Sequence, residues 1–456
     1  MATFKKLYPY QQKAVAALVP LLRKKRRVVA VSPTGSGKTV VGVATLLKMG
    51  KKIRVLWVAH RIELLEQARD KAHEIASLSG IPESDIGLLA GPDRVNIHAR
   101  ILVASVGSVV NRVDDLDTFD LIVVDEAHRT NANTYQRILG AWPGAMVLGL
   151  TATPKRLDGK ALGDSFNALY EIATQSQLLR EKRIAKIDTY GFPAEKLKKI
   201  LAGVATDAND YSRKKLGERM GNNVLVGDVV KAYQKRGGGE AAICFAASRE
   251  HAQKLVQRFK KAKLQVEYVD GDTDREERED IIRSFKNDEF DILVNVDVLT
   301  EGFDCGAKCI IDACPTKSVT RYLQRVGRGV RRVGDKVCIY LDHAGNYDRH
   351  KPPQDDRAWT LDGKVKNGEV VSGEEVCRVC QHCGLKSMVS PGTKVCPECG
   401  EMYSEVKRKL SEMKHLELVR RNKKAEEEKA RRVIYKKISV LKKYPASWVQ
   451  RQMRRS

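Results

Sequence analysis

Short runs of apolar, β-branched residues alternate along the chain with longer amphipathic stretches, in two successive rounds. Several runs are apolar at every position, as expected for strands that are covered on both faces of a sheet. This alternation predicts βαβ units and parallel sheets, so the fold class is α/β. The predicted strands are Val28–Val31, Ile53–Ala59, Ile101–Ala104, Leu121–Val124 and Met146–Leu150, then Ala241–Phe245, Gln265–Val269, Ile292–Val296, Ile310–Ala313 and Val337–Leu341.

The two rounds predict two tandem sheet domains and three smaller C-terminal regions. A helical stretch of mixed charge, Ala194–Lys235, leads into the second round, and Gln253–Lys261 and Arg275–Phe285 have helical patterns. Beyond the second round, Pro and Gly predict a linker, five cysteines crowd together, and a basic helical pattern ends the chain. The predicted regions are 1–190, 191–349, a linker 350–375, a cysteine-rich module 376–402 and a tail 403–456.

Composition narrows the class of protein. The 456 residues are 42% hydrophobic, which excludes a mainly disordered chain. No apolar run approaches the roughly 18 residues of a membrane span, and the N-terminus has no signal-peptide pattern, so we expect a cytoplasmic protein without a membrane partner. The 82 Lys and Arg against 57 Asp and Glu give a net charge of +25. Such an excess indicates a polyanionic partner, nucleic acid in preference to a membrane.

The segment SPTGSGKT (32–39) lies between a predicted strand and a predicted helix, the context that a phosphate-binding loop requires. Gly35 and Gly37 would let backbone N–H groups approach the phosphates at a helix N-terminus. We expect Lys38 to reach the β- and γ-phosphates of ATP and the Thr39 hydroxyl to bind Mg²⁺. The residues expected to contact the nucleotide here are Thr34, Gly35, Ser36, Gly37, Lys38 and Thr39.

The segment DEAH (125–128) follows the strand Leu121–Val124. Asp125 could hold Mg²⁺ through water, and Glu126 could orient and polarise the attacking water. A carboxylate pair at a strand end could also merely cap a helix. The phosphate-binding loop earlier in the same round favours the catalytic interpretation.

The segment YLQRVGRGVRR (322–332) contains four arginines around Gly327 and Gly329. This spacing would let Arg328 and Arg331 project across a cleft toward a γ-phosphate, where an arginine is worth on the order of 10³–10⁵ in rate. The alternative is a surface or nucleic-acid contact only.

In chain order, SPTGSGKT, AHR (59–61), DEAH, TAT (151–153), GFD (302–304) and QRVGRGVRR resemble the motifs of superfamily 2 helicases. The resemblance covers about residues 7–345. It implies two RecA-like domains and ATP hydrolysis stimulated by nucleic acid. LVNVDVLTEGF (293–303) and DHAGN (342–346), with a C-terminal zinc ribbon, resemble bacterial RadD-like and phage-encoded helicases, which implies a role in DNA replication, recombination or repair.

The same resemblance implies roles for further residues. Gln11, within LYPYQ, would read the adenine edge. Thr300 and Glu301 would lie at the interdomain cleft, touching nucleic acid or the ribose. The other positions carried over are His128, Thr151 and Thr153 for coupling hydrolysis to domain closure, Gly302 and Asp304 at the interdomain cleft, and Gln324 among the catalytic candidates.

The cysteine-rich module contains two CxxC pairs, each followed by glycine, and this doubled pattern suits a tetrahedral thiolate Zn²⁺ site. Four thiolates leave no open position, so the metal would be structural. The expected ligands are Cys380, Cys383, Cys396 and Cys399. Cys377 would be spare, His382 is a lesser ligand candidate, and a redox pair is the alternative. The five cysteines upstream are expected to be buried reduced thiols.

The tail carries much of the positive charge. Residues 401–456 contain 18 Lys and Arg against 7 Asp and Glu, a net charge of +11. Ser404–Tyr435 has a helical pattern, and Tyr444 and Trp448 add aromatic surface. Charge combined with aromatic residues favours binding to nucleic-acid phosphates over a merely solvated helix. A replication or repair protein is a second candidate partner for this region.

The sequence therefore predicts an ATP-dependent DNA helicase or translocase that uses ATP, Mg²⁺ and structural Zn²⁺, with DNA favoured over RNA. Four alternatives stay open: an enzyme that remodels or anneals duplexes, an ATP-gated binding or loading factor, an RNA helicase, and the motor subunit of a restriction system. No nuclease motif supports the last.

Overall fold

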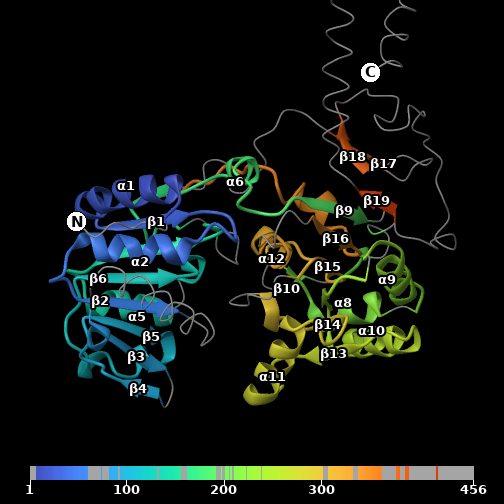
Figure 1. Cartoon of the computed structure of the whole chain (residues 1–456), viewed down its shortest axis with the longest axis horizontal. Coiled ribbons are helices and arrows are strands. Elements are labelled where there is room, and N and C mark those ends of the chain that lie inside the picture. Colours follow the sequence, from blue (N-terminus) through green and yellow to red (C-terminus); the bar gives the residue numbers. More distant parts are fainter. Residues whose placement is uncertain are drawn as a thin grey trace, which may run out of the picture.

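Two α/β domains lie side by side in the computed structural model, each built around a mainly parallel sheet (Figure 1). The structure describes residues 7–59, 73, 82–90, 93–130, 133–155, 162–191, 197, 201–204, 206–207, 210–221, 223–237, 239–300, 307–331, 337–361, 376–379, 386–389 and 417–419. In these ranges, no helix has both the length and the apolar composition that crossing a bilayer demands.

The first domain has a sheet in the order β4-β3-β5-β2-β6-β7-β1-β8, parallel except for the pair β3–β4. Its strands are β1 (Arg27–Val31), β2 (Val55–Ala59), β3 (Ile86–Ala90), β4 (Asp93–Val95), β5 (Ile101–Ser105), β6 (Leu121–Asp125), β7 (Met146–Thr151) and β8 (Ala168–Glu171). Its helices are α1 (Pro9–Lys25), α2 (Lys38–Met49), α4 (Val106–Val110), α5 (Asn133–Ala141) and α6 (Gln175–Arg180), with short 3₁₀ turns η1 (Glu83–Asp85), η2 (Val113–Asp115) and η3 (Ala127–Arg129). Because β6, β7 and β1 are neighbours, the segments that follow them meet at one edge of the sheet.

The second domain has a sheet in the order β13-β14-β12-β15-β16-β9-β19-β18-β17. Its strands are β9 (Ile187–Gly191), β12 (Ala242–Phe245), β13 (Val266–Val269), β14 (Ile292–Asn295), β15 (Cys309–Asp312), β16 (Cys338–Asp342), β17 (Val376–Val379), β18 (Lys386–Val389) and β19 (Glu417–Val419), with a separate hairpin of β10 (Thr206–Asp207) and β11 (Asp210–Tyr211). Its helices are α8 (Arg213–Met220), α9 (Asn223–Arg236), α10 (Arg249–Lys261), α11 (Arg275–Lys286), α12 (Val319–Val326) and α13 (Asn346–His350), with the 3₁₀ turn η4 (Val298–Thr300). The ten strands predicted from the apolar runs are confirmed within a residue or two, and the α/β class with two parallel-sheet domains is confirmed.

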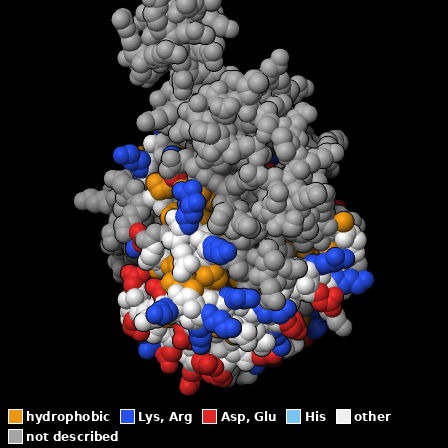
Figure 2. Space-filling view, turned by 90° about the vertical axis from the view of Figure 1, so that its right-hand side faces the viewer, with side chains coloured by type: hydrophobic (Ala, Val, Ile, Leu, Met, Phe, Trp, Pro, Cys, Tyr) orange, Lys and Arg blue, Asp and Glu red, His pale blue; other side chains and the backbone are white. Residues whose placement is uncertain are grey.

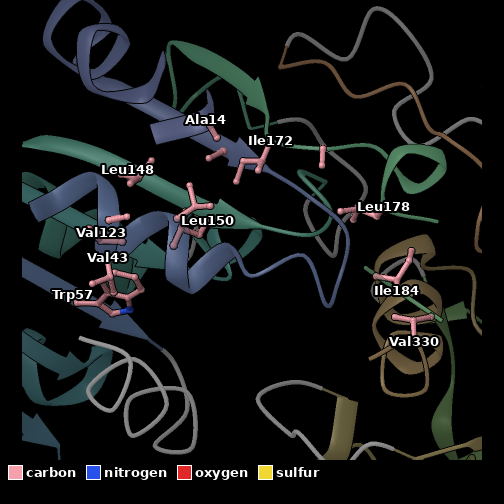
Figure 3. Packing of buried hydrophobic residues seen from close by; sticks show 14 of the residues in the cluster. Ala14, Val43, Trp57, Val123, Leu148, Leu150, Ile172, Leu178, Ile184 and Val330 are labelled. Carbon is pink, nitrogen blue, oxygen red and sulfur yellow. The ribbon is translucent and has the colours of Figure 1, made fainter. Parts of the chain in front are cut away.

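Alternate residues of the strands enter different hydrophobic cores, as the pleat of a sheet requires. In β6, Val123 belongs to the core beneath α1 and α2, and Val124 belongs to the core on the opposite face. The core that contains Val123 continues through Ile172 and Ile184 to Val330 of the second domain (Figure 3). The two domains therefore share apolar contacts at their junction.

A segment that follows the second sheet returns to the first domain. Asp356 accepts hydrogen bonds from the backbone N–H and the hydroxyl of Ser176, at 2.8 and 2.6 Å. Farther along, the N–H of Gly163 donates to the carbonyl of Leu361 at 3.0 Å. Residues 351–361 thus connect the second domain to α6 and to the region after β7.

Four features differ from the sequence-based picture. The boundary predicted at residue 190 falls inside β9, which pairs with β16 of the second sheet. The hairpin β10–β11 interrupts the stretch predicted to be helical. Residues 351–361 of the predicted linker pack on both domains, because the amide of Gln354 bonds the backbone of Ala185 and Ile187 at 2.9 and 3.0 Å. In the tail, β19 replaces part of the predicted helix, since it pairs with β9.

Candidate active site at the domain junction

The predicted phosphate-binding loop connects β1 to α2. Gly35 has φ +85° and Gly37 has φ +80°, a conformation that residues with side chains rarely adopt. A Cβ at Gly37 would also lie 2.5 Å from Nε2 of Gln11, so the position has no room for a side chain. The two glycines let the loop curve tightly before the N-terminus of α2, where an anion is favoured.

Residues 8–11, at the start of α1, are hydrogen-bonded to this loop. The Tyr10 hydroxyl and Nε2 of Gln11 both donate to the carbonyl of Ser36, at 2.7 and 3.0 Å. The N–H of Tyr8 donates to Oε1 of Gln11 at 3.0 Å, which fixes the orientation of the amide. Burial raises the pKa of Tyr10 to about 12, so its hydroxyl stays a donor. Each end of the Gln11 amide keeps one further hydrogen-bonding position for a base.

Two carboxylates lie where β6 ends. The N–H of Glu126 donates to Oδ1 of Asp125 at 3.0 Å, and the residues are only 8% and 4% exposed. Burial, together with the neighbouring charge of Glu126, raises the pKa of Asp125 to about 7. A cation relieves such repulsion, and oxygen ligands suit Mg²⁺. With the hydroxyl of Thr39 in the first turn of α2, this donor set fits the predicted metal.

Lys38 lies within the electrostatic field of both domains. Burial lowers the pKa of Lys38, and its Nζ donates to the carbonyl of Pro33 at 3.4 Å. Glu126 and Asp125 of the first domain oppose this lowering, whereas Arg331 and Arg328 of the second domain add to it. The predicted catalytic charges of the two domains therefore meet around one lysine.

His128 connects the DEAH segment to the TAT segment at the end of β7. Its Nδ1 lies 3.3 Å from Oε2 of Glu126 and 3.3 Å from the hydroxyl of Thr151. That hydroxyl also accepts a hydrogen bond from the N–H of Thr153 at 3.2 Å. The three predicted coupling residues form one buried network with Glu126.

The end of α12 packs directly against the phosphate-binding loop. A Cβ at Gly327 would lie 2.8 Å from the hydroxyl of Thr34, so only glycine permits this approach. Arg328 is buried and its Nε donates to the carbonyl of Gln324 at 3.3 Å. The Gln324 side chain is also buried, and neither end of its amide has a hydrogen-bond partner in the described part of the chain. Buried amides are normally hydrogen-bonded, so a ligand bound at this junction would provide the partner that Gln324 lacks among the described residues.

Arg325, in the same arginine-rich segment, points away from the loop into the second domain. Its guanidinium lies 3.3 Å from Asp312 and donates to the carbonyl of Cys314 at 2.6 Å. The sequence pattern assigned the catalytic role to Arg328 and Arg331 and no role to Arg325, whose burial against Asp312 makes it structural. Sequence reasoning also missed Tyr10 and the segment 351–361, whose roles depend on contacts between distant parts of the chain.

Some predicted residues lie outside the described ranges. They include Glu301, Gly302 and Asp304, the four expected zinc ligands Cys380, Cys383, Cys396 and Cys399, and also Cys305, His382, Tyr444 and Trp448. Among the residues that the structure describes, no group of three or more His, Cys, Asp or Glu side chains is placed to hold a metal. The zinc site therefore stays a prediction.

A phosphate loop, a carboxylate pair and arginines at the junction of two RecA-like domains define a two-domain ATPase, and comparison with known proteins places it in a family. Residues 4–156 match the family described as the res subunit of type III restriction enzymes, and residues 225–333 match the helicase conserved C-terminal domain. A 51.5 kDa protein of a Lactococcus phage is 31% identical over 399 residues, which are 86% of this chain and 82% of that protein. The chain belongs to the superfamily 2 helicases and is an ATPase of that family.

Two other relatives have helicase or translocase names. IRC3 of Saccharomyces cerevisiae, named as an ATP-dependent helicase, is 28% identical over 74% of this chain, which spans only 51% of that protein. The DNA 3′-5′ translocase XPB2 of Sulfurisphaera tokodaii is 26% identical, covering 74% of this chain and 81% of its own. These names describe those proteins.

A solved structure shares the fold. The DNA-bound type ISP restriction-modification enzyme LlaBIII aligns with a TM-score of 0.53 at 17% identity. The alignment covers 74% of this chain and 27% of that enzyme. At this identity the likeness concerns the arrangement of the two RecA-like domains.

Proposed function

We propose that this superfamily 2 enzyme is a DNA-stimulated ATPase that moves along or remodels DNA in replication, recombination or repair. The observation that carries the proposal is that the second domain packs on the phosphate-binding loop of the first: Gly327 lies against Thr34, and Cγ of Arg331 would lie 3.9 Å from a Cβ at Gly35. Two carboxylates of the first domain and two arginines of the second all act on the pKa of the adjacent Lys38. A site divided in this way is complete only when the domains are together. Nucleotide state can then control their relative position.

Each residue of the site has a proposed role. Adenine would bind at Gln11, and the phosphates would bind at the loop and Lys38. Mg²⁺, held by Thr39 and Asp125, would neutralise charge on the phosphates. Glu126 would orient the attacking water, because its carboxylate is already fixed by His128 at 3.3 Å.

The arginines would serve the transition state and the mechanical step. Arg328 and Arg331 would stabilise charge on the transferred phosphoryl group. Like charges on these arginines and Lys38 repel one another, as their effect on the Lys38 pKa reflects. A bound triphosphate would cancel this repulsion and hold the domains together, and release of phosphate would restore it. The network of His128, Thr151 and Thr153 would transmit the state of Glu126 to β7.

The charge distribution supports a nucleic-acid track. Helices α8, α9 and α10 together contain twelve Lys or Arg and three Asp or Glu, a net charge of +9. Figure 2 looks toward this side of the second domain, where Lys and Arg side chains gather around an apolar patch. The similarity to a protein named as a DNA 3′-5′ translocase supports DNA as the partner.

The test is steady-state ATP hydrolysis without nucleic acid and with single-stranded DNA, duplex DNA, forked DNA or RNA. We expect DNA to stimulate turnover more than RNA does. Stronger stimulation by RNA would favour an RNA helicase. ATP-gated DNA binding without sustained turnover would favour a loading or annealing factor. Strand-separation assays on the forked substrate distinguish unwinding from translocation alone.

We also propose a structural zinc ribbon on the edge of the second sheet. β17 and β18 pair as an antiparallel hairpin, and Cys380 and Cys383 occur in the six residues that connect them. Hairpin connections of this kind suit paired thiolate ligands. Metal analysis should find one zinc per chain, and the double variant C380S/C396S should lose it. C377S is the matched control and should retain the metal. Loss of zinc from C377S would mean that Cys377 is one of the ligands.

The tail is proposed to bind phosphates. Residues 420–456 contain fourteen Lys or Arg and three Asp or Glu, so truncation after Val419 removes +11 and keeps β19. The truncation should make the dependence of log K on log salt shallower by roughly two to four units on single strands, because each lost phosphate contact removes about 0.7. Parallel slopes for the two proteins would indicate a protein-docking arm.

A further inference from the structure

Residues 183–186, between α6 and β9, contact both domains at their junction. The Arg183 guanidinium lies over the Tyr8 ring, with its Cζ 3.6 Å from the ring centroid. The next residue, Ile184, packs at the phosphate-binding loop, where its Cγ2 would lie 3.3 Å from a Cβ at Gly35. Ile184 also forms a β-bridge with Arg331 of the second domain. None of the motif residues lies within this segment.

The contact of Arg183 with Tyr8 is close although the two side chains are only partly buried. Tyr8 is 42% exposed and the Arg183 side chain is 28% exposed. The Tyr8 ring also stacks on Tyr10, with centroids 6.0 Å apart and planes 18° from parallel. Arg183 therefore covers the end of a short aromatic stack. A planar guanidinium suits this position because it stacks on the ring and is attracted to its face.

Tyr8 in turn holds the residue proposed to read adenine. Its backbone N–H donates to Oε1 of Gln11 at 3.0 Å, and Nε2 of Gln11 donates to Ser36 at 3.0 Å. A displacement of Tyr8 would remove the first of these bonds and free the amide to turn. The orientation of that amide decides which base edge it matches, because one end donates and the other accepts.

On the other side, the segment is held to the second domain by backbone bonds. The N–H of Ala185 donates to the carbonyl of Val330 at 2.8 Å, next to Arg331. Gln354 binds the carbonyl of Ala185 at 2.9 Å. The N–H of Arg183 itself donates to the carbonyl of Leu178 in α6 at 2.8 Å, so Arg183 lies between α6 and residues that are bound to the second domain. Tyr8 and Gln11 belong to the first domain.

We infer that Arg183 is a positioning residue that makes recognition of the nucleotide base depend on the second domain. Arg183 packs on Tyr8, and Tyr8 fixes the amide of Gln11. Arg183 itself belongs to the segment that forms a β-bridge with Arg331. The inference rests on the proposed role of Gln11 in binding adenine. It adds a contact between domains that acts on the base rather than on the phosphates. Base selectivity should then be lost without loss of the phosphate chemistry.

The test compares the full-length protein with R183A and R183K, using ATP and GTP as substrates. In R183A, KM for ATP should rise roughly three- to tenfold, as expected for one cation–π contact, while kcat changes less than twofold. The preference for ATP over GTP should fall by a similar factor. R183K keeps the charge without the planar group and should lie between R183A and the parent protein. R180A is the matched control, because Arg180 is exposed on α6, three residues away.

Equilibrium binding of ATP and GTP to the same variants separates this inference from the proposed enzyme function, since binding needs no turnover. A Y8A/R183A double variant should bind ATP no more weakly than the weaker single variant. Unchanged ATP affinity and unchanged ATP-to-GTP preference in R183A would overturn the inference. A loss confined to kcat would also overturn it, because Arg183 would then act on the phosphoryl transfer.

Discussion

Both sheets end a buried parallel strand in an aspartate, and the two aspartates have opposite environments. Asp125 ends β6 beside a second carboxylate, Glu126, and burial with this neighbour raises its pKa to about 7. Asp312 ends β15 and is fully buried, but it pairs with Arg325 at 3.3 Å and accepts hydrogen bonds from Tyr340 and Asn346 at 3.0 and 2.8 Å. One charge lacks full compensation within the protein, and the other is satisfied.

This difference separates a catalytic carboxylate from a structural one. A carboxylate that the fold destabilises can gain from a cation and a polarised water, as Asp125 and Glu126 would in catalysis. A carboxylate that the fold satisfies fixes its partners instead. Asp312 holds Arg325 on α12, and the end of this helix places Arg328 at the first domain. The first sheet thus provides the reactive carboxylates. The second sheet provides a rigid support that places arginines opposite them.

The largest expected effect is loss of turnover from changes in the first domain. K38A should abolish ATP hydrolysis because it removes a phosphate contact, and E126Q should abolish it because the water loses its orienting carboxylate. E126Q should still bind nucleotide, which equilibrium binding would measure. Near-normal turnover in either purified variant would contradict the assignment of the site.

Next in size is the loss from the arginines of the second domain. R328A and R331A should each lower kcat by about 10³-fold or more with a much smaller change in ATP affinity, because they act on transition-state charge. Parallel measurement of kcat and KM checks this. A change confined to KM would mean that these arginines bind the ground state.

The two aspartates should differ in their effect on stability. D312A leaves the charge of Arg325 buried without its carboxylate, so the free energy of unfolding should fall by about 3–5 kcal/mol. D125N should not destabilise the nucleotide-free protein at pH 8. A raised pKa means that the contribution of Asp125 to stability is present at pH below 4 and is lost as pH rises through 7. Urea unfolding of both variants measures the contrast, and equal losses would remove the distinction drawn here.

The smallest predicted effect is an acid sensitivity of the second domain, opposite in sign to that of Asp125. Burial lowers the pKa of His251 to about 4 and of His343 to about 3. Their lowered pKa values keep them neutral when folded, so stability is full at pH above 6.5 and decreases at lower pH as the unfolded chain takes up protons.

Urea unfolding at pH 7.5 and 5.5 measures this effect, which should be about 1.4 kcal/mol per histidine between the two values. H251Q keeps a side-chain acceptor for the N–H of Ala247, which His251 accepts at 3.2 Å, and should remove the contribution of one histidine. His343 keeps its contribution, and so does His350, whose pKa burial also lowers to about 4. Because Asp125 changes stability in the opposite direction over this range, the decisive comparison is between H251Q and the parent protein, and the same pH dependence in both would contradict the prediction.

Much of the two-sheet framework was predictable, because strands and the loops that follow them depend on the local pattern of apolar and polar residues. Apolar runs indicated ten strands, and glycine, lysine and carboxylates at strand ends indicated the loop at Lys38 and the pair at Asp125. The strand β9 was missed, since its partner β16 is far away in the sequence. The hairpin β10–β11 was missed because strands of two residues are too short to show a pattern of apolar positions. The packing of residues 351–361 on both domains was also missed. It depends on hydrogen bonds between distant parts of the chain, and composition does not show which groups those bonds join.

The sequence by itself determined which residue types carry charge and where strands end, because side-chain chemistry and periodicity are local properties. Only the tertiary structure decided which of those charges act together. Arg325 and Arg328 are three residues apart, yet one is turned toward Asp312 and the other lies near Lys38. Arg183 gains its contact with Tyr8 only when the chain between the domains returns to the phosphate-binding loop. Coulombic and stacking interactions depend on distance in space, which spacing along the chain does not give.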